Sequence, residues 1–217
     1  FSPGDFNFDG KTDLAVLGAG LAKVFLFYND GSIPTTSATA DLTITSFGIP
    51  AALASGDFNA DGRVDLAIGD TWQSSGDYTG KTYLFYNDGS IPTTAGTADL
   101  TITGETTNNY FGSSLASGDF NTDGKTDLAI GAYRYGSYDG RAYIFYNDGS
   151  IPTTAASADV IVSSDPGIAS YFGISLVSGD FNADGRTDLV IGAQAYSSNT
   201  GRVYTFYNDG SIPTTAA

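Results

Sequence analysis

The sequence predicts an all-β fold: a β-propeller built of four-stranded antiparallel blades, with about four blades in this chain. Three observations predict it. A loop of the form D-x-N-x-D-G-x-x-D occurs four times, starting at residues 5, 57, 119 and 180. A second motif, F-Y-N-D-G-S-I-P-T-T, begins at residues 27, 85, 145 and 206, so both motifs recur about every sixty residues. A complete repeat carries four short runs typical of strands, without a sustained helical period.

The third repeat shows the expected strands most clearly. We expect them at about 113–120, 128–132, 141–146 and 158–162. Asn147-Asp148-Gly149 is a strong hairpin signal, and Pro152 beyond it cannot donate to a central ladder. Four antiparallel strands repeated at this period indicate propeller blades. We expect one domain over 1–217, with blades at about 1–46, 47–104, 105–164 and 165–217, the last lacking its outer strand.

The repeated loop has the chemistry of a site for a hard cation. Side-chain oxygens stand at positions 1, 3, 5 and 9, and the backbone carbonyl at position 7 can add another oxygen. Calcium takes six to eight oxygen ligands, whereas zinc prefers Cys and His, which this chain lacks. Glycine at position 6 suits the reversal of the loop. Ordinary turns use the same residue types, but four copies with the same four oxygens favour a metal.

Composition excludes several classes of function. The chain of 217 residues has no histidine and no cysteine, so it has no Ser-His or Cys-His pair, and Glu105 is its only glutamate. We therefore do not expect an enzyme. The net charge is −15, and half of the 24 acidic residues lie in the four loops. Four bound divalent cations would bring this charge to about −7. Such acidity argues against nucleic-acid binding.

The compartment and the ends of the chain give further expectations. No apolar run approaches the length of a membrane span. Calcium loops of millimolar affinity suit an extracellular setting, so we expect a secreted or cell-surface protein. Residue 1 falls inside a repeat, and the fourth repeat has no outer strand. This leaves three alternatives: part of a longer propeller, a four-bladed ring, or a subunit whose open edge a neighbour completes by strand addition.

Short motifs around the loops resemble a known family. Phe111-Gly112 before the first strand and Ile130-Gly131-Ala132 after the loop are similar to the FG-GAP repeat of integrin α-subunit propellers and many bacterial extracellular proteins. The same marks occur at Phe172-Gly173 and Gly192-Ala193. The second repeat has Phe47-Gly48 but Gly69-Asp70, and the first keeps only Gly18-Ala19. The resemblance covers essentially the whole chain.

This resemblance implies about four calcium ions, one in the loop between the first two strands of each blade. The implied side-chain ligands, with the position-7 carbonyls, are Asp5, Asn7, Asp9, Lys11 and Asp13; Asp57, Asn59, Asp61, Arg63 and Asp65; Asp119, Asn121, Asp123, Lys125 and Asp127; and Asp180, Asn182, Asp184, Arg186 and Asp188. Dockerin or EF-hand loops are a rival, but position 12 holds Val16, Ile68 or Ile130 where those loops need a carboxylate.

The opposite face of the predicted propeller varies between repeats and is the candidate partner face. It holds Trp72, Tyr78, Tyr133, Arg134, Tyr135, Tyr138 and Tyr196. Loops on a rigid scaffold commonly carry binding, and Trp, Tyr and Arg dominate interface energetics. The alternative is that these rings cover neighbouring blades. We predict a calcium-stabilised extracellular module for protein or glycan ligands. The alternative is a self-assembling subunit of a filament or tube, with further copies of the chain as partners.

Overall fold

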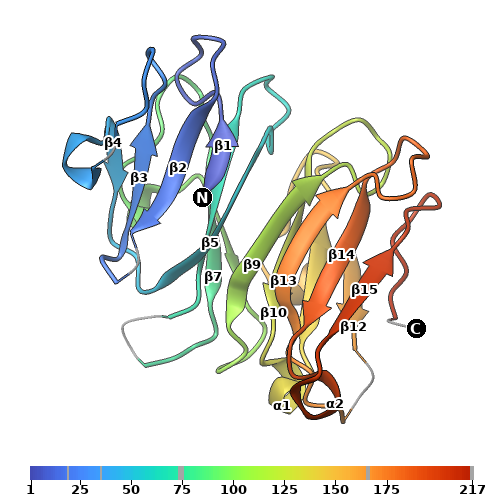
Figure 1. Ribbon diagram of the computed structural model, residues 1–217. Coiled ribbons are helices and arrows are strands. Elements are labelled where there is room, and N and C mark those ends of the chain that lie inside the picture. Colours follow the sequence, from blue (N-terminus) through green and yellow to red (C-terminus); the bar gives the residue numbers. More distant parts are fainter. Residues whose placement is uncertain (19, 35, 73–75, 165–166, 216–217) are drawn as a thin grey trace.

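Four antiparallel β-sheets, one for each sequence repeat, make up the computed structural model (Figure 1). The structure describes residues 1–18, 20–34, 36–72, 76–164 and 167–215, so Ala19 of the first Gly-Ala mark lies outside the described residues. The first sheet contains β1 (Ser2–Gly4), β2 (Asp13–Gly18), β3 (Lys23–Phe27) and β4 (Leu42–Ile44). The second contains β5 (Pro50–Gly56), β6 (Asp65–Asp70), β7 (Lys81–Phe85) and β8 (Leu100–Thr103).

The other two sheets repeat this plan. The third contains β9 (Phe111–Gly118), β10 (Asp127–Ala132), β11 (Arg141–Phe145) and β12 (Val160–Ser163), and the fourth contains β13 (Phe172–Gly179), β14 (Asp188–Ala193) and β15 (Arg202–Phe206). Strand order follows chain order in every sheet. Among the described residues the fourth sheet has three strands. The all-β blade architecture is thus confirmed, and the strands of the third repeat agree with the expected ones to within about two residues.

Short helical turns connect the strands. Three 3₁₀ turns, Ser37–Thr39, Ala95–Thr97 and Ala155–Ser157, precede the outer strands. The four-residue helices α1 (Tyr135–Tyr138) and α2 (Tyr196–Asn199) lie at the lower end of the sheets in Figure 1, and each contains residues with left-handed backbone angles. No described helix is long and apolar enough to cross a membrane.

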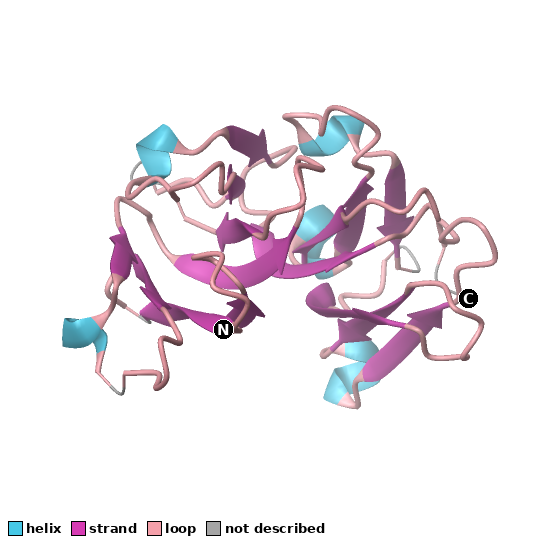
Figure 2. Cartoon of the chain, turned by 90° about the horizontal axis from the view of Figure 1, so that it is seen from above, coloured by secondary structure: helices cyan, strands magenta, loops and turns pink. Residues whose placement is uncertain are grey.

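The sheets stand side by side along an arc (Figure 2). The innermost strands are neighbours: β5 packs against β1 and β9, and β9 packs against β13. Hydroxyl groups connect them, since Ser117 donates to the carbonyl oxygen of Ser55 at 2.8 Å and Ser178 donates to that of Ser117 at 2.6 Å. β1 and β13 share no contact of comparable extent within the described ranges.

The hydrophobic cores lie between consecutive blades rather than within one blade. Each of three clusters combines residues of two neighbouring repeats. The aromatic residue at loop position 2 is an example: Phe120 of the third repeat is fully buried in a cluster with Leu189, Ile191 and Phe206 of the fourth. The equivalent Phe181 is 49% exposed. Burial of an aromatic side chain is a large apolar contribution, so blade-to-blade contact supplies much of the stability.

Close backbone approach between blades explains the glycines of the Phe-Gly and Gly-Ala motifs. A Cβ atom at Gly69 would overlap the carbonyl oxygen of Gly112 in the next blade, and one at Gly131 would overlap that of Gly173. Gly112 and Gly173 both adopt a φ of +84°, which glycine reaches at little cost. Glycine is therefore needed on both sides of this contact.

We predict that Phe120→Ala lowers the free energy of unfolding by about 3–5 kcal/mol, because it opens a cavity between two blades. The matched change Phe181→Ala should cost less than about 1 kcal/mol, since this side chain is already half exposed. Urea unfolding followed by circular dichroism measures both. Equal losses for the two variants would contradict an interblade core.

Candidate metal loops and partner face

The four repeated loops share one conformation, held by their own oxygen side chains. In the third copy, the Asp123 N–H donates to Asp119 Oδ1 at 3.1 Å and to Asn121 Oδ1 at 3.0 Å. The Gly124 N–H donates to Asp119 Oδ2, and the Lys125 N–H donates to Asp123 Oδ1, both at 2.9 Å. The same four bonds recur in the other three copies. The side-chain oxygens at positions 1, 3 and 5 therefore point toward the backbone N–H groups of their own loop.

Two left-handed residues in each loop produce this inward turn. Position 6 is glycine with a φ between +80° and +86°. Position 4 is a non-glycine residue in the same region: Phe8, Ala60, Thr122 and Ala183 have φ values between +60° and +66°. A left-handed non-glycine residue costs about 1–2 kcal/mol. Repetition of this cost in all four loops indicates that the loop shape serves more than a chain reversal.

The aspartate at position 9 lies apart from the exposed carboxylates and is buried. Asp65, Asp127 and Asp188 are fully buried, and Asp13 is 1% exposed. In the third blade, Asp127 Oδ2 accepts the Phe120 N–H and Oδ1 accepts the Asn147 N–H, both at 2.8 Å. All four copies make this pair of bonds, at 2.7 to 2.9 Å. Position 9 thus fastens the loop to the end of the third strand.

The asparagine at that strand end extends the connection to the preceding blade. Asn87 Nδ2 donates to the carbonyl oxygen of Phe6 at 3.0 Å, and Asn208 Nδ2 donates to that of Phe120 at 3.1 Å. Asn147 Nδ2 donates to the carbonyl oxygen of Asp57 at 3.4 Å. Each of these acceptors belongs to the loop of the previous repeat. A chain of buried and partly buried hydrogen bonds therefore joins each loop to the loop beside it.

Burial raises the pKa of Asp65 and of Asp127 to about 6. The neighbouring loop carboxylates raise the pKa further, while the two backbone N–H groups lower it. The ionised form of these aspartates is therefore disfavoured by its surroundings. A cation in the loop would favour that form by direct attraction.

The donor chemistry of the loops fits calcium, although the oxygens are not gathered around one point. No group of three or more acidic side chains stands in metal-binding geometry among the described residues. An oxygen that accepts one N–H keeps a second lone pair, and positions 1, 3 and 5 are within reach of solvent. The set consists of carboxylate and amide oxygens, which suit Ca²⁺. The side chains at positions 1, 3 and 5 would hold it, with the position-7 carbonyl, after a local turn of the side chains. The position-9 aspartate, also expected as a ligand, is buried with both oxygens on backbone N–H groups.

The residues at position 7 differ between blades in their side-chain contacts. Lys11 Nζ forms an ion pair with Asp9 at 3.0 Å, which lowers the pKa of that carboxyl. Arg63 and Arg186 instead donate to the carbonyl oxygens of Asn87 and Asn208, at 3.3 and 3.2 Å. These arginines therefore reinforce the junction between loop and strand end.

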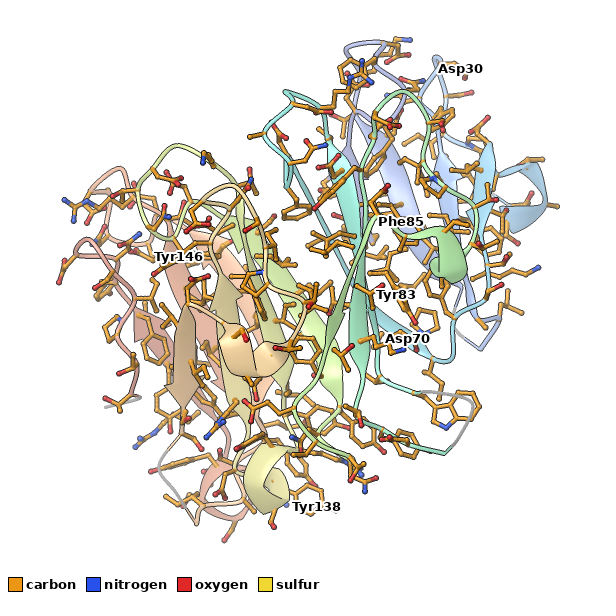
Figure 3. The ribbon with its side chains drawn as sticks, turned by 180° about the vertical axis from the view of Figure 1, so that it is seen from behind. Asp30, Asp70, Tyr83, Phe85, Tyr138 and Tyr146 are labelled. Atoms are coloured by element: carbon orange, nitrogen blue, oxygen red, sulfur yellow. The ribbon has the colours of Figure 1, made fainter. Side chains whose placement is uncertain are left out.

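The opposite end of the blades carries a group of aromatic rings, which we call the tyrosine cluster: Tyr78, Tyr110, Tyr133, Tyr138 and Tyr171, with Arg134. The rings of Tyr78 and Tyr110 stack with their centres 4.7 Å apart. The ring centres of Tyr133 and Tyr138 lie 5.6 and 5.4 Å from that of Tyr171. The Arg134 guanidinium lies 4.3 Å from the Tyr110 ring centre and 5.3 Å from that of Tyr138. Figure 3 shows Tyr138 at the end of the molecule opposite Asp30, which belongs to an Asn-Asp-Gly turn.

The tyrosine cluster includes four of the seven partner-face residues expected from the sequence, and the other three lie elsewhere. The Tyr135 ring centre lies 3.6 Å from the guanidinium carbon of Arg141, and the Tyr196 ring centre lies 4.1 Å from that of Arg202. These rings therefore cover the edges of their own blades. Trp72 borders a separate hollow of about 210 Å³ beside Asp70 and Tyr83.

Sequence reasoning missed Tyr110 and Tyr171. Both precede a Phe-Gly pair, and both have left-handed φ values, +58° and +55°. The signal was the shared Tyr-Phe-Gly sequence at two equivalent places. An unusual backbone angle at a bulky residue is a mark of a constrained site.

Comparison with known proteins agrees with this architecture. The FG-GAP repeat profile matches residues 111–145 and 172–206, and an FG-GAP-like repeat profile matches residues 5–68. Together the matches cover more than half of the chain, which belongs to the FG-GAP repeat family.

Two kinds of curated relative carry similar sequence. A phosphatidylinositol-glycan-specific phospholipase D from Homo sapiens is 35% identical over 175 residues, which are 74% of this chain and 21% of that protein. Integrin alpha-PS5 from Drosophila melanogaster is 36% identical over 147 residues, 65% of this chain and 14% of that protein. Integrin alpha-3 from Cricetulus griseus is 36% identical over 104 residues, 46% of this chain and 9% of that protein. The chain thus spans between 9% and 21% of the length of each of these relatives.

We predict that Asp127→Ala destabilises the protein by about 3 kcal/mol in calcium-free buffer, since it leaves two buried N–H groups without an acceptor. The control Asp123→Ala changes an exposed loop carboxylate and should cost less than about 1 kcal/mol under the same conditions. Chemical unfolding in EDTA measures both losses. A similarly small loss of unfolding free energy in both variants would show that the position-9 aspartate does not hold the loop to the third strand.

Proposed function

We propose that this chain is a calcium-binding, extracellular β-propeller module that binds a protein or glycan partner, with calcium in a structural role. The observation that carries this proposal is the fourfold loop: the same oxygens, the same backbone bonds and the same buried aspartate in every blade. The acidic loops account for half of the acidic residues of a chain with net charge −15. Bound calcium would offset the repulsion between these carboxylates.

Calcium would act on blade association as well as on the loop. Each loop is connected through the position-9 aspartate and an asparagine amide to a neighbouring loop. An ion that holds the loop in one conformation would therefore also hold the backbone carbonyl that accepts the asparagine amide of the next blade. The ion would supply charge neutralisation and geometric constraint, and the residues of the chain would supply the oxygen ligands and the interblade contact.

We predict that the melting temperature rises with calcium and falls when EDTA is added. A ligand present at a hundred times its dissociation constant stabilises the folded state by about 2.7 kcal/mol per site. Differential scanning calorimetry with calcium, magnesium and EDTA measures the shift. Asp123→Ala should reduce the calcium-dependent shift while it leaves the melting temperature in EDTA nearly unchanged. An identical melting temperature with and without calcium rules out a structural role for the ion.

The tyrosine cluster is the part of the surface that we propose for partner binding. It combines stacked rings with one guanidinium, and it borders a hollow of about 400 Å³ lined by Asn108, Asn109 and Ser137. Rings of this kind stack on sugars and also anchor protein interfaces. The described residues contain no histidine or cysteine base or nucleophile, so we propose a binding module rather than an enzyme. The activity named for the phospholipase relatives is not extended to this chain.

For the glycan form of this proposal, we predict that Tyr138→Ala lowers glycan binding at least tenfold on a glycan array. Tyr138 is 40% exposed at the rim of the tyrosine cluster, so the loss would come from stacking and not from unfolding. Tyr207→Ala, a similarly exposed tyrosine at the other end of its blade, is the control and should bind normally. Trp72→Ala tests the separate hollow beside Asp70 and Tyr83 in the same assay. Equal loss in the control would contradict a site at the tyrosine cluster.

Assembly through the open sheet edge is a second candidate function, and one observation favours it. In the described part of the chain, β15 pairs with β14 alone, whereas β3, β7 and β11 each pair with an outer strand as well. An unpaired edge is a template for another chain. Light scattering in calcium should then show particles larger than the single chain, and a single species at the mass of one chain would contradict this candidate.

A further inference from the structure

The guanidinium of Arg134, in the tyrosine cluster, has no carboxylate partner among the described residues. The ion pairs in that part of the chain join other side chains, Lys11 with Asp9 and Arg141 with Glu105. Arg134 instead donates from Nη1 to the Tyr110 hydroxyl at 3.2 Å, and its Nε is buried without a hydrogen-bond partner. A guanidinium carries five N–H donors and a full positive charge, so one neutral phenol does not compensate this cation.

Aromatic rings and backbone bonds hold Arg134 in place. Its guanidinium carbon lies 4.3, 5.6 and 5.3 Å from the ring centres of Tyr110, Tyr133 and Tyr138. Its backbone N–H donates to the carbonyl oxygen of Asn109, and its own carbonyl oxygen accepts the Tyr138 N–H, both at 3.3 Å. A side chain that is already positioned loses little conformational freedom when a ligand binds. Arg134 is therefore set to receive an anionic group.

Arg134 also borders the hollow of about 400 Å³ beside the tyrosine cluster. This volume lies within the range of about 300–1,000 Å³ that is typical of small-molecule sites. The lining consists of amide, hydroxyl, guanidinium and phenol side chains: Thr107, Asn108, Asn109, Arg134, Ser137 and Tyr138. Amides and hydroxyls both donate and accept hydrogen bonds. They match a ligand rich in hydroxyl groups better than the apolar anchor of a peptide.

Three residues of this lining have left-handed backbone angles. Asn108, Ser137 and Tyr138 have φ values of +62°, +64° and +80°. Each such non-glycine residue costs about 1–2 kcal/mol, and strain of this kind gathers at ligand sites. Tyr138 is 40% exposed, so its ring is available to stack on a sugar.

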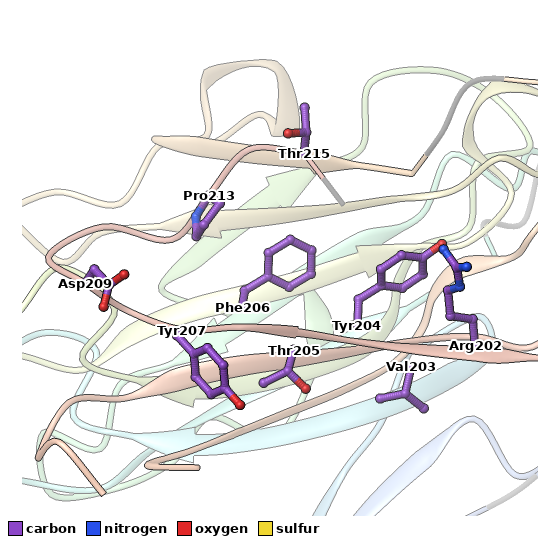
Figure 4. A pocket seen from close by; sticks show the side chains of 9 residues that line it. All are labelled: Arg202, Val203, Tyr204, Thr205, Phe206, Tyr207, Asp209, Pro213 and Thr215. Atoms are coloured by element: carbon purple, nitrogen blue, oxygen red, sulfur yellow. The ribbon is translucent and has the colours of Figure 1, made fainter. Parts of the chain in front are cut away.

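The hollow beside β15, of about 540 Å³, is built differently (Figure 4). Its lining includes the apolar side chains of Val203, Phe206 and Pro213, which offer no hydrogen bond to a hydroxyl group. It also includes the carboxylate of Asp209, which repels an anion. Among the described residues, no acidic side chain lines the hollow beside Arg134. That hollow is therefore the better match for an acidic, hydroxyl-rich ligand.

The strongly negative chain keeps most of its acidic loops away from this site. Figure 3 shows Tyr138 at the end of the molecule opposite Asp30. The turn that contains Asp30 is joined to the first acidic loop, because the Asn29 N–H donates to Asp13 at 2.7 Å. Charges separated by more than about 8 Å are largely screened at physiological ionic strength. The repeated loops therefore do not prevent an anion from reaching Arg134.

From these observations we propose that the hollow beside Arg134 binds the carboxylate-bearing unit of an acidic glycan, such as a hexuronic acid. Arg134 pairs with the carboxylate, Tyr138 stacks on the sugar ring, and the amide and hydroxyl side chains of the hollow bond the sugar hydroxyls. This deepens the proposed function, on whose glycan form it rests, by naming the class of sugar.

The test is isothermal titration calorimetry of the intact chain, in calcium-containing buffer, with trigalacturonic acid and with its carboxyl-reduced, neutral counterpart. The acidic trisaccharide should bind saturably with a 1:1 stoichiometry, and the neutral one at least tenfold more weakly. This comparison uses the unaltered chain, so it does not depend on the folding of any variant.

Variants of the chain locate the site. Arg134→Gln should bind the acidic trisaccharide at least tenfold more weakly than the wild type. Arg134→Lys keeps the charge but loses the planar fork, so its affinity should fall between the two. The control Lys23→Gln removes one positive charge from an exposed side chain of the first blade and should bind as the wild type does. Melting temperatures of the three variants check their folding.

Several results would overturn the proposal. Equal binding of the neutral trisaccharide would do so and would leave a general glycan-binding module standing. Undiminished binding by a folded Arg134→Gln would place the acid elsewhere, for example on calcium in the loops. A tri-aspartate peptide that binds as tightly would point to a peptide ligand instead. Absence of saturable binding up to about 1 mM of either trisaccharide would overturn both this inference and its glycan basis, while the calcium-dependent melting shift tests the structural role of the ion independently.

Discussion

The buried aspartate at the end of each loop is the contact on which the blade structure depends. Its two oxygens accept one N–H from the loop and one from the end of the third strand, in all four blades. A buried carboxylate is costly unless it is hydrogen-bonded, so these bonds must persist for the blade to hold. Because the adjoining asparagine reaches the previous loop, the local constraint becomes an interblade constraint. Loop chemistry and blade packing are thus parts of one hydrogen-bonded system.

In the function we propose, this connection would give calcium a role beyond local neutralisation of charge. The exposed carboxylates at positions 1 and 5 shape the loop, while the buried one transmits that shape to the next blade. The strain of left-handed residues at position 4 is repeated fourfold, as expected for a loop whose conformation serves a ligand. The near-identical loop face then acts as scaffold. The opposite face, where the loops differ, holds the tyrosine cluster that we propose for partner binding.

Much of the fold follows from the sequence because the repeat is so regular. The period, the Asn-Asp-Gly turns and the β-favouring runs place the strands of the third blade to within about two residues. The spacing also marks the four repeated loops, and the role of their residues as calcium ligands stays a prediction. Sequence could not reveal that Asp127 is buried with both oxygens on backbone N–H groups, since its spacing equally fits a metal ligand. Nor could it separate Tyr135 and Tyr196, which pack on arginines of their own blades, from Tyr133 and Tyr138 in the cluster. Those assignments depend on contacts between distant residues.

We propose that every loop holds one calcium ion, and equilibrium dialysis with radioactive calcium measures the number bound. We expect about four ions per chain at saturation, with dissociation constants of about 10⁻⁴–10⁻³ M, which suit extracellular calcium. The quadruple variant Asp9→Ala, Asp61→Ala, Asp123→Ala and Asp184→Ala should bind almost none. A wild-type chain that takes up no calcium at millimolar concentration would contradict metal binding and leave the four loops as turns.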